Sequence, residues 1–420
     1  MKILVYPHDL KMGGSQLNAI EIAGAIQQRG HEVVVFGRPG PLVEHIDRLG
    51  LEFVECPGIR RRPSPAAIRA LRRLVRERGI DVVHGYEWPP SLECYLAAHQ
   101  MPGTAAVSTV MSMAVAPFIP AHMPVAVGTG QIAAAEEAFG RDSVTLLEPP
   151  VDVASNRPGL SLDQAGFRER WGLRPEAQIV AVVSRLARQL KLEGILAAIE
   201  AVSALSGTQD VQLLIAGDGP AHDEVAACAA ETNRVHGRSV VVLTGELQDP
   251  RAAYDVADVC LGMGGSALRA MAFAKPLVVQ GEEGFWELLT PDSVDQFLWQ
   301  GWYGVGTDAP AGAAHLTGIL AELLPERSLR AELSNFSLSL ARDRFTLERA
   351  ADTQLDIYVR ALHKGGNPAS TLASDCRAAA SFANYESRRM LARWTGRESA
   401  EDFNAKPVAA IHSQFVRSAR

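Results

Sequence analysis

Three cations lie close together after an apolar run near the middle of the chain. Arg185, Arg188 and Lys191 follow residues 178–183, a run typical of a buried strand, and precede a segment with helical spacing. Cations at the carboxyl end of a strand and beside a helix N-terminus are suited to neutralise phosphate oxygens. A solvated, charged surface loop is the alternative. The position at the end of a strand favours an anion site.

A glycine-rich segment offers backbone amides to the same kind of ligand. Gly264, Gly265 and Ser266 end the segment 261–266 and lead into a helix predicted to start near Ala267. A helix N-terminus carries unpaired N–H groups and the positive end of the helix dipole, so this segment is receptive to an anion. A glycine turn without a ligand is the alternative.

Gly13 and Gly14 form a similar junction between a strand over residues 2–6 and a helix that ends at Gly30. Their amides could face a phosphate or the charge that develops on a leaving group. A tight turn that needs glycine dihedral angles explains these two residues equally well.

Composition places the chain among globular proteins. It has 420 residues, of which 47% are hydrophobic and 21% charged, which is enough apolar material for two domains. A long uncharged apolar run and a signal-peptide pattern are both absent, so a cytoplasmic location is expected. The net charge of −7 argues against a general nucleic-acid binder.

The cysteines show no spacing that would hold zinc or form a redox pair, and we interpret them as buried thiols. They are Cys56, Cys94, Cys228, Cys260 and Cys376.

Apolar periodicity predicts two α/β domains, each with a doubly wound parallel sheet. In the first half, strands are predicted over residues 2–6, 31–36 and 80–84, and an arginine-rich helix over 64–78. The second half repeats the pattern, with strands predicted over residues 178–183, 211–216, 239–243, 257–261 and 276–280, and a helix over 194–205. We therefore expect two Rossmann-like domains that face a cleft, with ligands at the carboxyl ends of the strands.

The expected boundaries follow turn formers and changes in composition. The first domain is expected over residues 1–155, and the second over residues 160–345 after a linker. Residues 346–420 are assigned to a closing helix, a hinge and a helical tail. These three segments are predicted over residues 345–362, 364–370 and 372–394. The first of them is expected to close the second domain.

The order and spacing of several motifs resemble the GT-B glycosyltransferases of family 4, from residue 1 to about residue 362. The motifs are Gly13-Gly14, residues 183–186 with Lys191, residues 215–220, 243–245 and 254–259, and residues 270–279. The resemblance implies a retaining sugar transfer from a nucleotide-diphosphate donor, with no metal and no bound cofactor.

The same resemblance implies roles for individual residues. Residues placed like Arg185 and Lys191 hold the donor diphosphate in that family, and amides of the turn before Gly265 assist them. Residues placed like Glu246 and Leu247 lie near the nucleobase. The cations and the helix dipole stabilise the leaving diphosphate. The expected donor-binding residues are Gly13, Gly14, Arg185, Lys191, Glu246, Leu247, Gly264, Gly265, Ser266 and Arg269. Catalytic residues stay unassigned, with Gly14, Arg185 and Lys191 as candidates.

Two glutamates of the family are replaced in this chain. When residues 270–272 are aligned with the family tripeptide, Leu261 and Arg269 stand at the two glutamate positions. A cation one turn into the predicted helix is expected to oppose the helix dipole. Arg269 is expected either to reach an anion of the donor or of an acidic sugar, or to form an ion pair with Glu282 or Glu283.

The family also tends to carry a histidine near the reacting sugar. His84 and His122 are the nearest candidates here. A structural role is the alternative for each of them.

The sequence also contains a cluster of aromatic residues and a series of arginines that forms a basic strip, and each of them has two possible interpretations. The aromatic residues suit either sugar or base stacking or core packing. They are Trp286, Trp299 and Trp302 with Phe285, Phe297 and Tyr303. The basic strip suits either an anionic membrane surface that carries a lipid acceptor, or a solvated helix face. It contains Arg60, Arg61, Arg62, Arg69, Arg72, Arg73, Arg76 and Arg78.

The expected partners are a nucleotide sugar and an acceptor that is a small molecule, a glycan or a lipid. Weak contact with a membrane surface and self-association are left open, and nucleic acid is not expected. A catalytically weak, glycosyltransferase-like nucleotide-binding protein or partner subunit is the alternative, because both family glutamates are missing. A nicotinamide dehydrogenase is disfavoured, because no strand is followed by the full glycine fingerprint with a downstream acidic residue.

Overall fold

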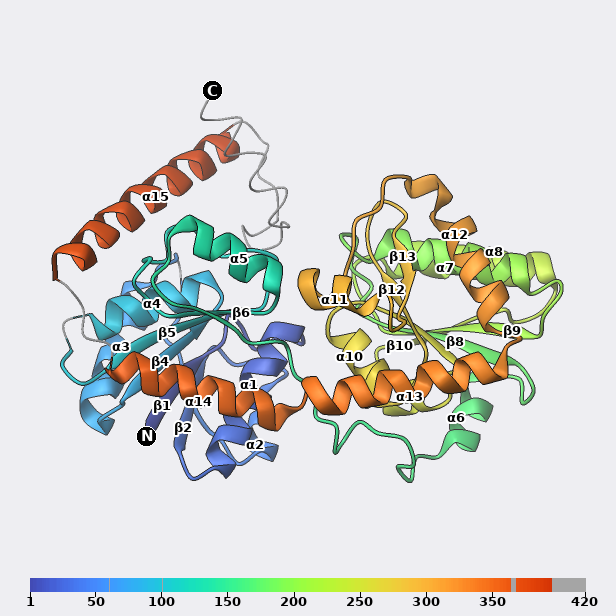
Figure 1. The fold of residues 1–420 in the computed structure, drawn as a ribbon, viewed down its shortest axis with the longest axis horizontal. Helices are drawn as coiled ribbons and strands as arrows, with labels where there is room; N and C mark the ends of the chain where they lie inside the picture. Colours follow the sequence, from blue (N-terminus) through green and yellow to red (C-terminus); the bar gives the residue numbers. More distant parts are fainter. Residues whose placement is uncertain (60, 100, 364–367, 395–420) are drawn as a thin grey trace. The chain divides into compact units, whose positions relative to one another are not determined.

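The computed structural model describes residues 1–59, 61–99, 101–363 and 368–394, and these form two compact units, each built on one sheet (Figure 1). One unit contains Met1–Pro149 and the chain from Leu347 onward. The other contains Pro150–Thr346. The architecture is therefore the expected α/β class with two parallel-dominated sheets.

The first unit is built on a parallel sheet with the strand order β3-β2-β1-β4-β5-β6-β7. Its strands are β1 (Lys2–Tyr6), β2 (Glu32–Gly37), β3 (Glu52–Glu55), β4 (Val82–Tyr86), β5 (Ala105–Val110), β6 (Val125–Val127) and β7 (Val144–Leu146). The strand order reverses between β1 and β4, which are hydrogen-bonded neighbours. Ligands of doubly wound sheets bind outside the carboxyl ends of the strands at such a reversal.

Helices cover both faces of this first sheet (Figure 1). They are α1 (Gly14–Gln28), α2 (Val43–Arg48), α3 (Pro65–Arg78), α4 (Trp88–Ala98), α5 (Gly130–Phe139) and α14 (Leu347–His363). Helix α15 (Pro368–Trp394) packs outside this layer, on α4 and on the segment between β5 and β6. Successive residues of β1 point to opposite faces, so Ile3 packs with α1 and α14 whereas Leu4 packs with α3 and α4.

The arginine-rich helix α3 shows how local sequence sets an element's ends. The Ser64 side chain accepts a hydrogen bond from the N–H of Ala67, and Pro65 occupies the first helical position. Gly79 ends the helix in the left-handed conformation, with φ of 64°. The predicted range of 64–78 is confirmed to within one residue.

The second unit has the strand order β10-β9-β8-β11-β12-β13, and its strands are parallel except for the antiparallel β13. They are β8 (Gln178–Val183), β9 (Val211–Ala216), β10 (Val241–Gly245), β11 (Val259–Gly262), β12 (Leu277–Gln280) and β13 (Trp286–Leu288). The strand order reverses between β8 and β11.

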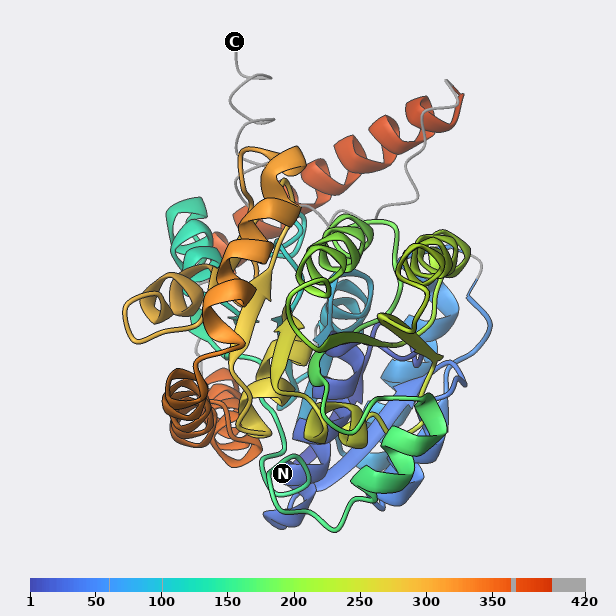
Figure 2. The same cartoon turned by 90° about the vertical axis from the view of Figure 1, so that its right-hand side faces the viewer.

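Helices also cover both faces of the second sheet (Figure 2). They are α6 (Gln164–Trp171), α7 (Leu192–Leu205), α8 (His222–His236), α9 (Arg251–Asp255), α10 (Gly265–Ala272), α11 (Val294–Gln300), a 3₁₀ turn (Ala309–Ala311), α12 (Gly312–Leu323) and α13 (Arg327–Arg344). Val180 packs with α7, α8 and α12, whereas Ile179 packs with α9 and α10.

The strands predicted from apolar runs are confirmed as β1, β2, β4, β8, β9, β10, β11 and β12, within two residues at each end. The strands β3, β5, β6, β7 and β13 were not predicted. Of these, β6, β7 and β13 have only three residues each, too few to show a period. Glutamates flank the edge strand β3, and β5 begins with two alanines, a residue depleted in strands.

Helix α14 packs on the first sheet, contrary to the expectation that it closes the second domain. Its apolar residues Ala351, Ile357 and Tyr358 belong to the core formed with α1 and β1. Arg29 at the end of α1 fixes this contact through a 2.8 Å ion pair with Asp352. The predicted tail helix is confirmed as α15, although it begins four residues earlier than expected, and residues 364–367 of the predicted hinge lie outside the described residues.

Candidate functional site

The first candidate site residues meet where the strand order of the second sheet reverses. Val182 of β8 lies opposite Leu261 of β11 in parallel register. The segment after β8 contains Arg185 and Lys191, and the segment after β11 leads into α10. Because neighbouring parallel strands end at the same edge, both segments leave the sheet beside each other.

Two glycines hold the segment after β8 in place. A Cβ on Gly217 would lie 1.9 Å from the carbonyl oxygen of Ser184, and a Cβ on Gly219 would lie 2.5 Å from that of Leu186. The N–H of Leu186 donates to the carbonyl of Asp218 at 2.9 Å. From the sequence, residues 217–220 indicate only a turn. In the structure their glycines allow the backbone after β9 to approach and support the segment that carries Arg185.

Arg185 and Lys191 lie in different environments within this segment. The Arg185 side chain is exposed, whereas that of Lys191 is half-buried and stands directly before α7. Burial lowers the pKa of Lys191 to about 8. The preceding Leu190 has a φ of 65°, a conformation that is strained for a bulky residue. A partly desolvated ammonium group held by a strained backbone is suited to an anionic ligand.

The start of α10 supplies amides on the other side of the strand reversal. Gly264 is exposed and has a φ of 56°, which requires glycine at this position. The helix geometry leaves the amides of Gly265 and Ser266 without partners inside the helix. The Ser266 hydroxyl is engaged locally, since it donates to the carbonyl of Met263 at 2.9 Å. This end of α10 therefore offers backbone N–H groups to an anion.

Arg269 leans back over this helix start. One guanidinium nitrogen, Nη1, lies 3.9 Å from the position that a Cβ on Gly265 would take, as expected for helix side chains that tilt toward the N-terminus. The expected ion pair is wrong, because neither Glu282 nor Glu283 pairs with Arg269 in the described part of the chain. Glu282 instead accepts a 2.5 Å hydrogen bond from the hydroxyl of Tyr303.

Helix α10 has only eight residues, so the backbone of Arg269 belongs to its last turn. Its guanidinium nevertheless lies near the helix start, where the helix dipole opposes a positive charge, as expected. Leu261, the other replaced family glutamate, is buried within β11 and contributes to the core.

Glu246 and Leu247 follow β10 at the far side of the same sheet edge. Glu246 is exposed, and Leu247 packs partly against the core. Because β9 lies between β10 and β8, these residues leave the sheet two strands, or about 10 Å, from the segment of Arg185. That separation suits contacts to the distal end of a ligand whose phosphates lie near β8.

Gly13 and Gly14 begin α1 at the strand reversal of the first sheet. Gly13 has an extended backbone with φ of −168°, and Gly14 also avoids the left-handed region. The tight-turn interpretation of these glycines is therefore wrong. Gly14 is exposed, and a Cβ on it would meet nothing within 4 Å. The open space in front of this helix start is compatible with a ligand.

Glu87 is a residue at this reversal that sequence reasoning missed. It follows β4, is buried, and has a φ of 65°. Its carboxylate accepts hydrogen bonds from the Ser15 hydroxyl at 2.7 Å, the N–H of Met111 at 3.1 Å and the Ser112 hydroxyl at 2.5 Å. Glu87 thus joins the segments that follow β1, β4 and β5. The sequence feature that could have indicated Glu87 is its position directly after β4, at the carboxyl end of a strand.

The two histidine candidates have structural surroundings. His84 is fully buried within β4, where its Nδ1 lies 2.6 Å from the Tyr358 hydroxyl and its Nε2 lies 2.8 Å from the Thr109 hydroxyl. Burial lowers the pKa of His84 to about 3, so it is neutral at physiological pH. His122 packs on Tyr95. For His84 the structural alternative is confirmed.

The basic strip is divided between buried and exposed members. Arg62 donates 2.8 Å hydrogen bonds to the Tyr6 hydroxyl and to the Glu93 carboxylate, whose side chain is fully buried. Arg62 therefore does not belong to a surface strip. Arg78 pairs with Glu52 at 2.6 Å on the surface. Arg60 lies outside the described residues.

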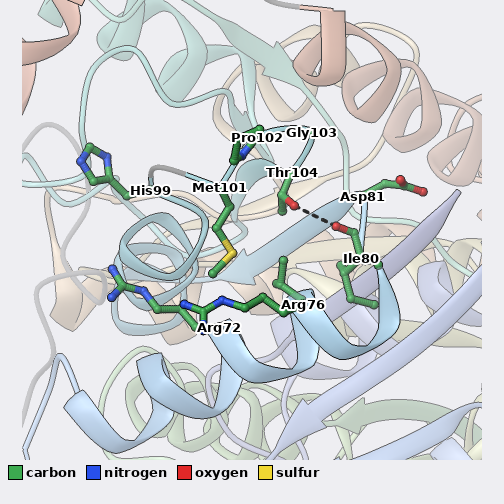
Figure 3. Close-up of a pocket in the computed structure, with 11 residues that line it drawn as sticks. Arg72, Arg76, Ile80, Asp81, His99, Met101, Pro102, Gly103 and Thr104 are labelled. Atoms are coloured by element: carbon green, nitrogen blue, oxygen red, sulfur yellow. Dashed lines mark hydrogen bonds between the residues drawn. The ribbon is translucent and has the colours of Figure 1, made fainter.

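A pocket of about 530 Å³ lies between α3 and the segment before β5 (Figure 3). Arg72, Arg76 and His99 contribute polar groups to its lining. Asp81 and Thr104 also line it, and they directly precede β4 and β5. The pocket is therefore at the amino edge of the first sheet, opposite to Glu87.

The aromatic cluster after α10 serves mainly in packing. Trp286, Phe297, Trp302 and Tyr303 are buried, whereas Trp299 is 53% exposed. Core packing is thus confirmed for the buried members.

The cysteine prediction is confirmed only in part. Cys56, Cys94 and Cys260 are buried thiols, but Cys228 is half-buried and Cys376 is exposed. Cys376 lies on the outward side of α15, which was expected only as an unassigned tail.

The described residues contain neither a cluster of metal-ligating side chains nor a helix that could span a membrane. No group of three or more metal-ligating side chains lies together in residues 1–363 and 368–394, apart from the undescribed positions among them. None of the helices described is long and apolar enough to cross a bilayer. A metal-free site stays a prediction.

Two family models match the chain, one on each unit. Residues 12–122 match the model described as Glycosyltransferase Family 4, and residues 177–315 match the model described as Glycosyl transferases group 1. The matches contain the segments that carry Gly13, Glu87, Arg185 and Arg269. No curated protein matches the sequence.

Solved structures with the same fold are distant in sequence. A glycosyltransferase from Rickettsia africae ESF-5 superposes with a TM-score of 0.69 at 15% identity, over 87% of this chain and 99% of its own. Anabaena Alr3699/HepE in complex with UDP-glucose gives 0.64 at 12% identity, over 85% and 100%. The catalytic domain of Arabidopsis thaliana starch synthase IV, bound to ADP and acarbose, gives 0.65 at 12% identity, over 87% and 100%.

Proposed function

We propose that this chain, which is a GT-B glycosyltransferase of the family 4-like type, transfers a sugar from a nucleotide diphosphate to an acceptor hydroxyl with retention of configuration. The observation that carries the proposal is the strand reversal between β8 and β11. There the segment with Arg185 and Lys191 follows β8, and the backbone amides that begin α10 follow β11. Both therefore lie at the same edge of the second sheet.

The chemistry at this edge is charge stabilisation of a leaving diphosphate. The bond between the anomeric carbon and the diphosphate oxygen breaks, and the acceptor oxygen bonds to that carbon on the same face. Negative charge grows on the departing diphosphate, where Arg185, Lys191 and the α10 amides stabilise it. The acceptor proton passes to an oxygen of the leaving phosphate, which becomes more basic as negative charge grows on it.

The donor is proposed to be a nucleotide sugar such as a uridine or adenosine diphosphate sugar. Structures of the same fold hold UDP, UDP-glucose or ADP. In this chain Glu246 and Leu247 would contact the base, because they lie two strands away from the phosphate-binding segment. The first unit would receive the acceptor at its own strand reversal, where Glu87 lies. Gly13 and Gly14, which the sequence places among the donor-binding residues, are therefore proposed here for the acceptor side.

Calorimetry with UDP, ADP and GDP beside their nucleosides tests the proposal. We expect one diphosphate to bind at least about tenfold more tightly than its nucleoside, because charge-assisted contacts to phosphate supply most of the affinity. Equal affinity for a nucleotide and its nucleoside would exclude a phosphate site at Arg185 and Lys191. Hydrolysis or transfer from the matching nucleotide sugar then establishes catalysis.

A nucleotide-binding protein without turnover is the second candidate. It is favoured by Leu261 and Arg269, which replace both family glutamates and remove two carboxylates from the donor edge. Tight binding of a diphosphate with neither hydrolysis nor transfer across a panel of acceptors would select this candidate over the first.

A further inference from the structure

Helix α15 lies beyond both family-model matches, which end at residues 122 and 315. The solved structures described above pair with 85–87% of the chain while covering almost all of their own length. In Figure 1 α15 is the red helix that follows the grey segment after α14. It contacts the first unit through aromatic ring pairs and side-chain hydrogen bonds.

The middle of α15 contributes two aromatic rings to a cluster at the carboxyl edge of the first sheet. The rings of Phe382 and Tyr385 lie 5.3 and 5.1 Å from that of Phe118, measured between centroids. The Tyr385 ring also lies 5.7 Å from Trp88, which meets Phe118 edge-on at 5.1 Å. Trp88 and Phe118 are almost fully buried. Such ring pairs stabilise the folded state by more than the burial of their apolar area alone.

The start of α15 is joined to the same region by polar contacts. The Tyr95 hydroxyl donates to Asp375 at 2.6 Å, and the N–H of Ala121 donates to the Ser374 hydroxyl at 2.9 Å. Ser374 is buried. These bonds fix the helix against α4 and against the segment between β5 and β6, residues 111–124, which we call the β5–β6 loop.

The β5–β6 loop is irregular but well packed along its whole length. Ala114, Val115 and Met123 are buried with Phe118. Arg141 is buried beneath the loop and donates to the carbonyl of Ile119 at 2.8 Å. The loop is therefore held by the hydrogen bond from Arg141 and by the packing of Phe118 against the aromatic rings of α15.

The beginning of this loop is the segment that Glu87 holds. Glu87 accepts from Met111 and Ser112 of the loop and from Ser15 at the start of α1. Trp88, which contacts α15, is the next residue after Glu87 in the chain. A continuous set of contacts thus runs from Phe382 and Tyr385 through the β5–β6 loop and Trp88 to Glu87.

We propose that α15 is a clamp that positions the acceptor side of the site. It holds the β5–β6 loop and Trp88 in place, and through them it sets the position of Glu87 and of the first turn of α1. Glu87 acts here as a positioning residue for the edge that Gly14 opens onto. The acceptor role of that edge rests on the proposed function, whereas the mechanical coupling does not.

Hydrogen exchange on the full-length chain separates this clamp from a helix that only adds stability. The variant is Phe382→Ala/Tyr385→Ala, and Arg377→Ala is the matched control, because Arg377 is an exposed residue of the same helix. We expect the double variant to speed amide exchange by about tenfold or more in the β5–β6 loop, at residues 87–88 and at residues 13–17. Exchange in β8, β9 and β11 should not change.

Two outcomes would overturn the proposal. One is faster exchange confined to α15 and residues 118–123, with residues 13–17 and 87–88 unaffected. The other is equal effects from Arg377→Ala. If the double variant does not fold, Tyr95→Phe replaces it, because this change removes only one hydroxyl and its hydrogen bond to Asp375. Amide exchange in the same segments is then measured for Tyr95→Phe and judged by the same two outcomes.

Nucleotide and acceptor assays then connect the clamp to catalysis. With UDP-glucose as donor probe and p-nitrophenyl glycosides as acceptor probes, the double variant should keep UDP affinity within about twofold and keep donor hydrolysis, while losing acceptor-dependent transfer. If wild type binds no UDP, ADP or GDP, the proposed function fails, and the exchange experiment alone decides whether the clamp exists. Parallel loss of UDP affinity and transfer would contradict a role confined to the acceptor side.

Discussion

Val182 of β8 and Leu261 of β11 are register partners in adjacent parallel strands, at the point where the strand order of the second sheet reverses. This pairing brings together two segments that are separated by about eighty residues in the sequence. Arg185 and Lys191 follow one partner, and the amides of α10 follow the other. The anion site that the sequence suggested in two separate pieces is therefore one edge of one sheet.

Replacement of either cation by alanine should weaken binding of the diphosphate far more than binding of the nucleoside. For Arg185→Ala and Lys191→Ala we expect a loss of about 1.5–3 kcal/mol, roughly tenfold to a hundredfold in affinity. Calorimetry with UDP and uridine measures both. Arg188→Ala is the control, because Arg188 lies in the same segment but forms an exposed ion pair with Glu224. A Lys191→Ala variant with wild-type affinity for UDP would mean that the donor site is misplaced.

The affinity for the diphosphate should fall as pH rises. Burial lowers the pKa of Lys191 to about 8, so the fraction of protein with a charged ammonium decreases through that pH. We expect weaker UDP binding at about pH 9 than at about pH 7, and a flatter profile for Lys191→Arg, whose guanidinium stays charged throughout. An identical pH profile for wild type and Lys191→Arg would contradict this assignment.

The same shift has a consequence for stability. The ordinary pKa of 10.5 applies to Lys191 in the unfolded chain, which therefore binds more protons than the folded chain between about pH 8 and pH 10.5. The contribution of Lys191 to the free energy of unfolding should rise with pH across this window. Denaturant titrations of wild type and Lys191→Met at several pH values would measure it.

Arg269 should act on the donor rather than on the fold. Its guanidinium lies over the start of α10 and has no carboxylate partner in the described chain, so its charge is available to an anion. Arg269→Gln should lower donor affinity and turnover, and Arg269→Glu should lower them further, especially at low salt. Arg251→Gln, which breaks the exposed pair with Asp249, serves as the control. Lower thermal stability with unchanged donor affinity in Arg269→Gln would assign a structural role to this residue.

The pair of Arg62 and Glu93 should matter for stability rather than for catalysis. Their 2.8 Å contact is buried on the Glu93 side, and removal of one partner from such a pair costs about 3–5 kcal/mol of unfolding free energy. Urea unfolding of Arg62→Met should show this loss, and Arg62→Met/Glu93→Gln should recover part of it. Arg73→Met, which breaks an exposed pair with Glu77, should cost less than about 1 kcal/mol. Similar costs for Arg62→Met and Arg73→Met would mean that the buried pair adds no more than a surface one.

Chelation should leave turnover intact. The phosphate-binding edge holds cations and backbone amides, and no group of three or more metal-ligating side chains lies together in the part of the chain that the structure describes. Donor hydrolysis measured with and without EDTA should agree. Activity that EDTA abolishes and magnesium restores would show that an ion takes part.

The strands that could be predicted are those with long apolar runs. Residues 178–183 and 211–216 are buried on both faces in parallel sheets, so their composition alone identifies β8 and β9. The three-residue β6 and β7 carry too few residues for any pattern, and only pairing with a neighbouring strand defines them. The same limit applies to β13.

The sequence by itself determined the α/β class, the cations after β8, the glycines before α10 and the family resemblance, because these depend on residue type and local spacing. Only the tertiary structure decided which segments meet. Helix α14 packs on the first sheet although it follows the second, and Glu87 joins three segments through contacts 24 to 72 residues apart. Local periodicity contains no information about such pairings, since they arise when whole apolar faces and buried polar groups find partners at long range. Arg269 is a further case, because only the structure shows that its guanidinium lies over the start of α10 and that Glu282 bonds to Tyr303 instead of pairing with it.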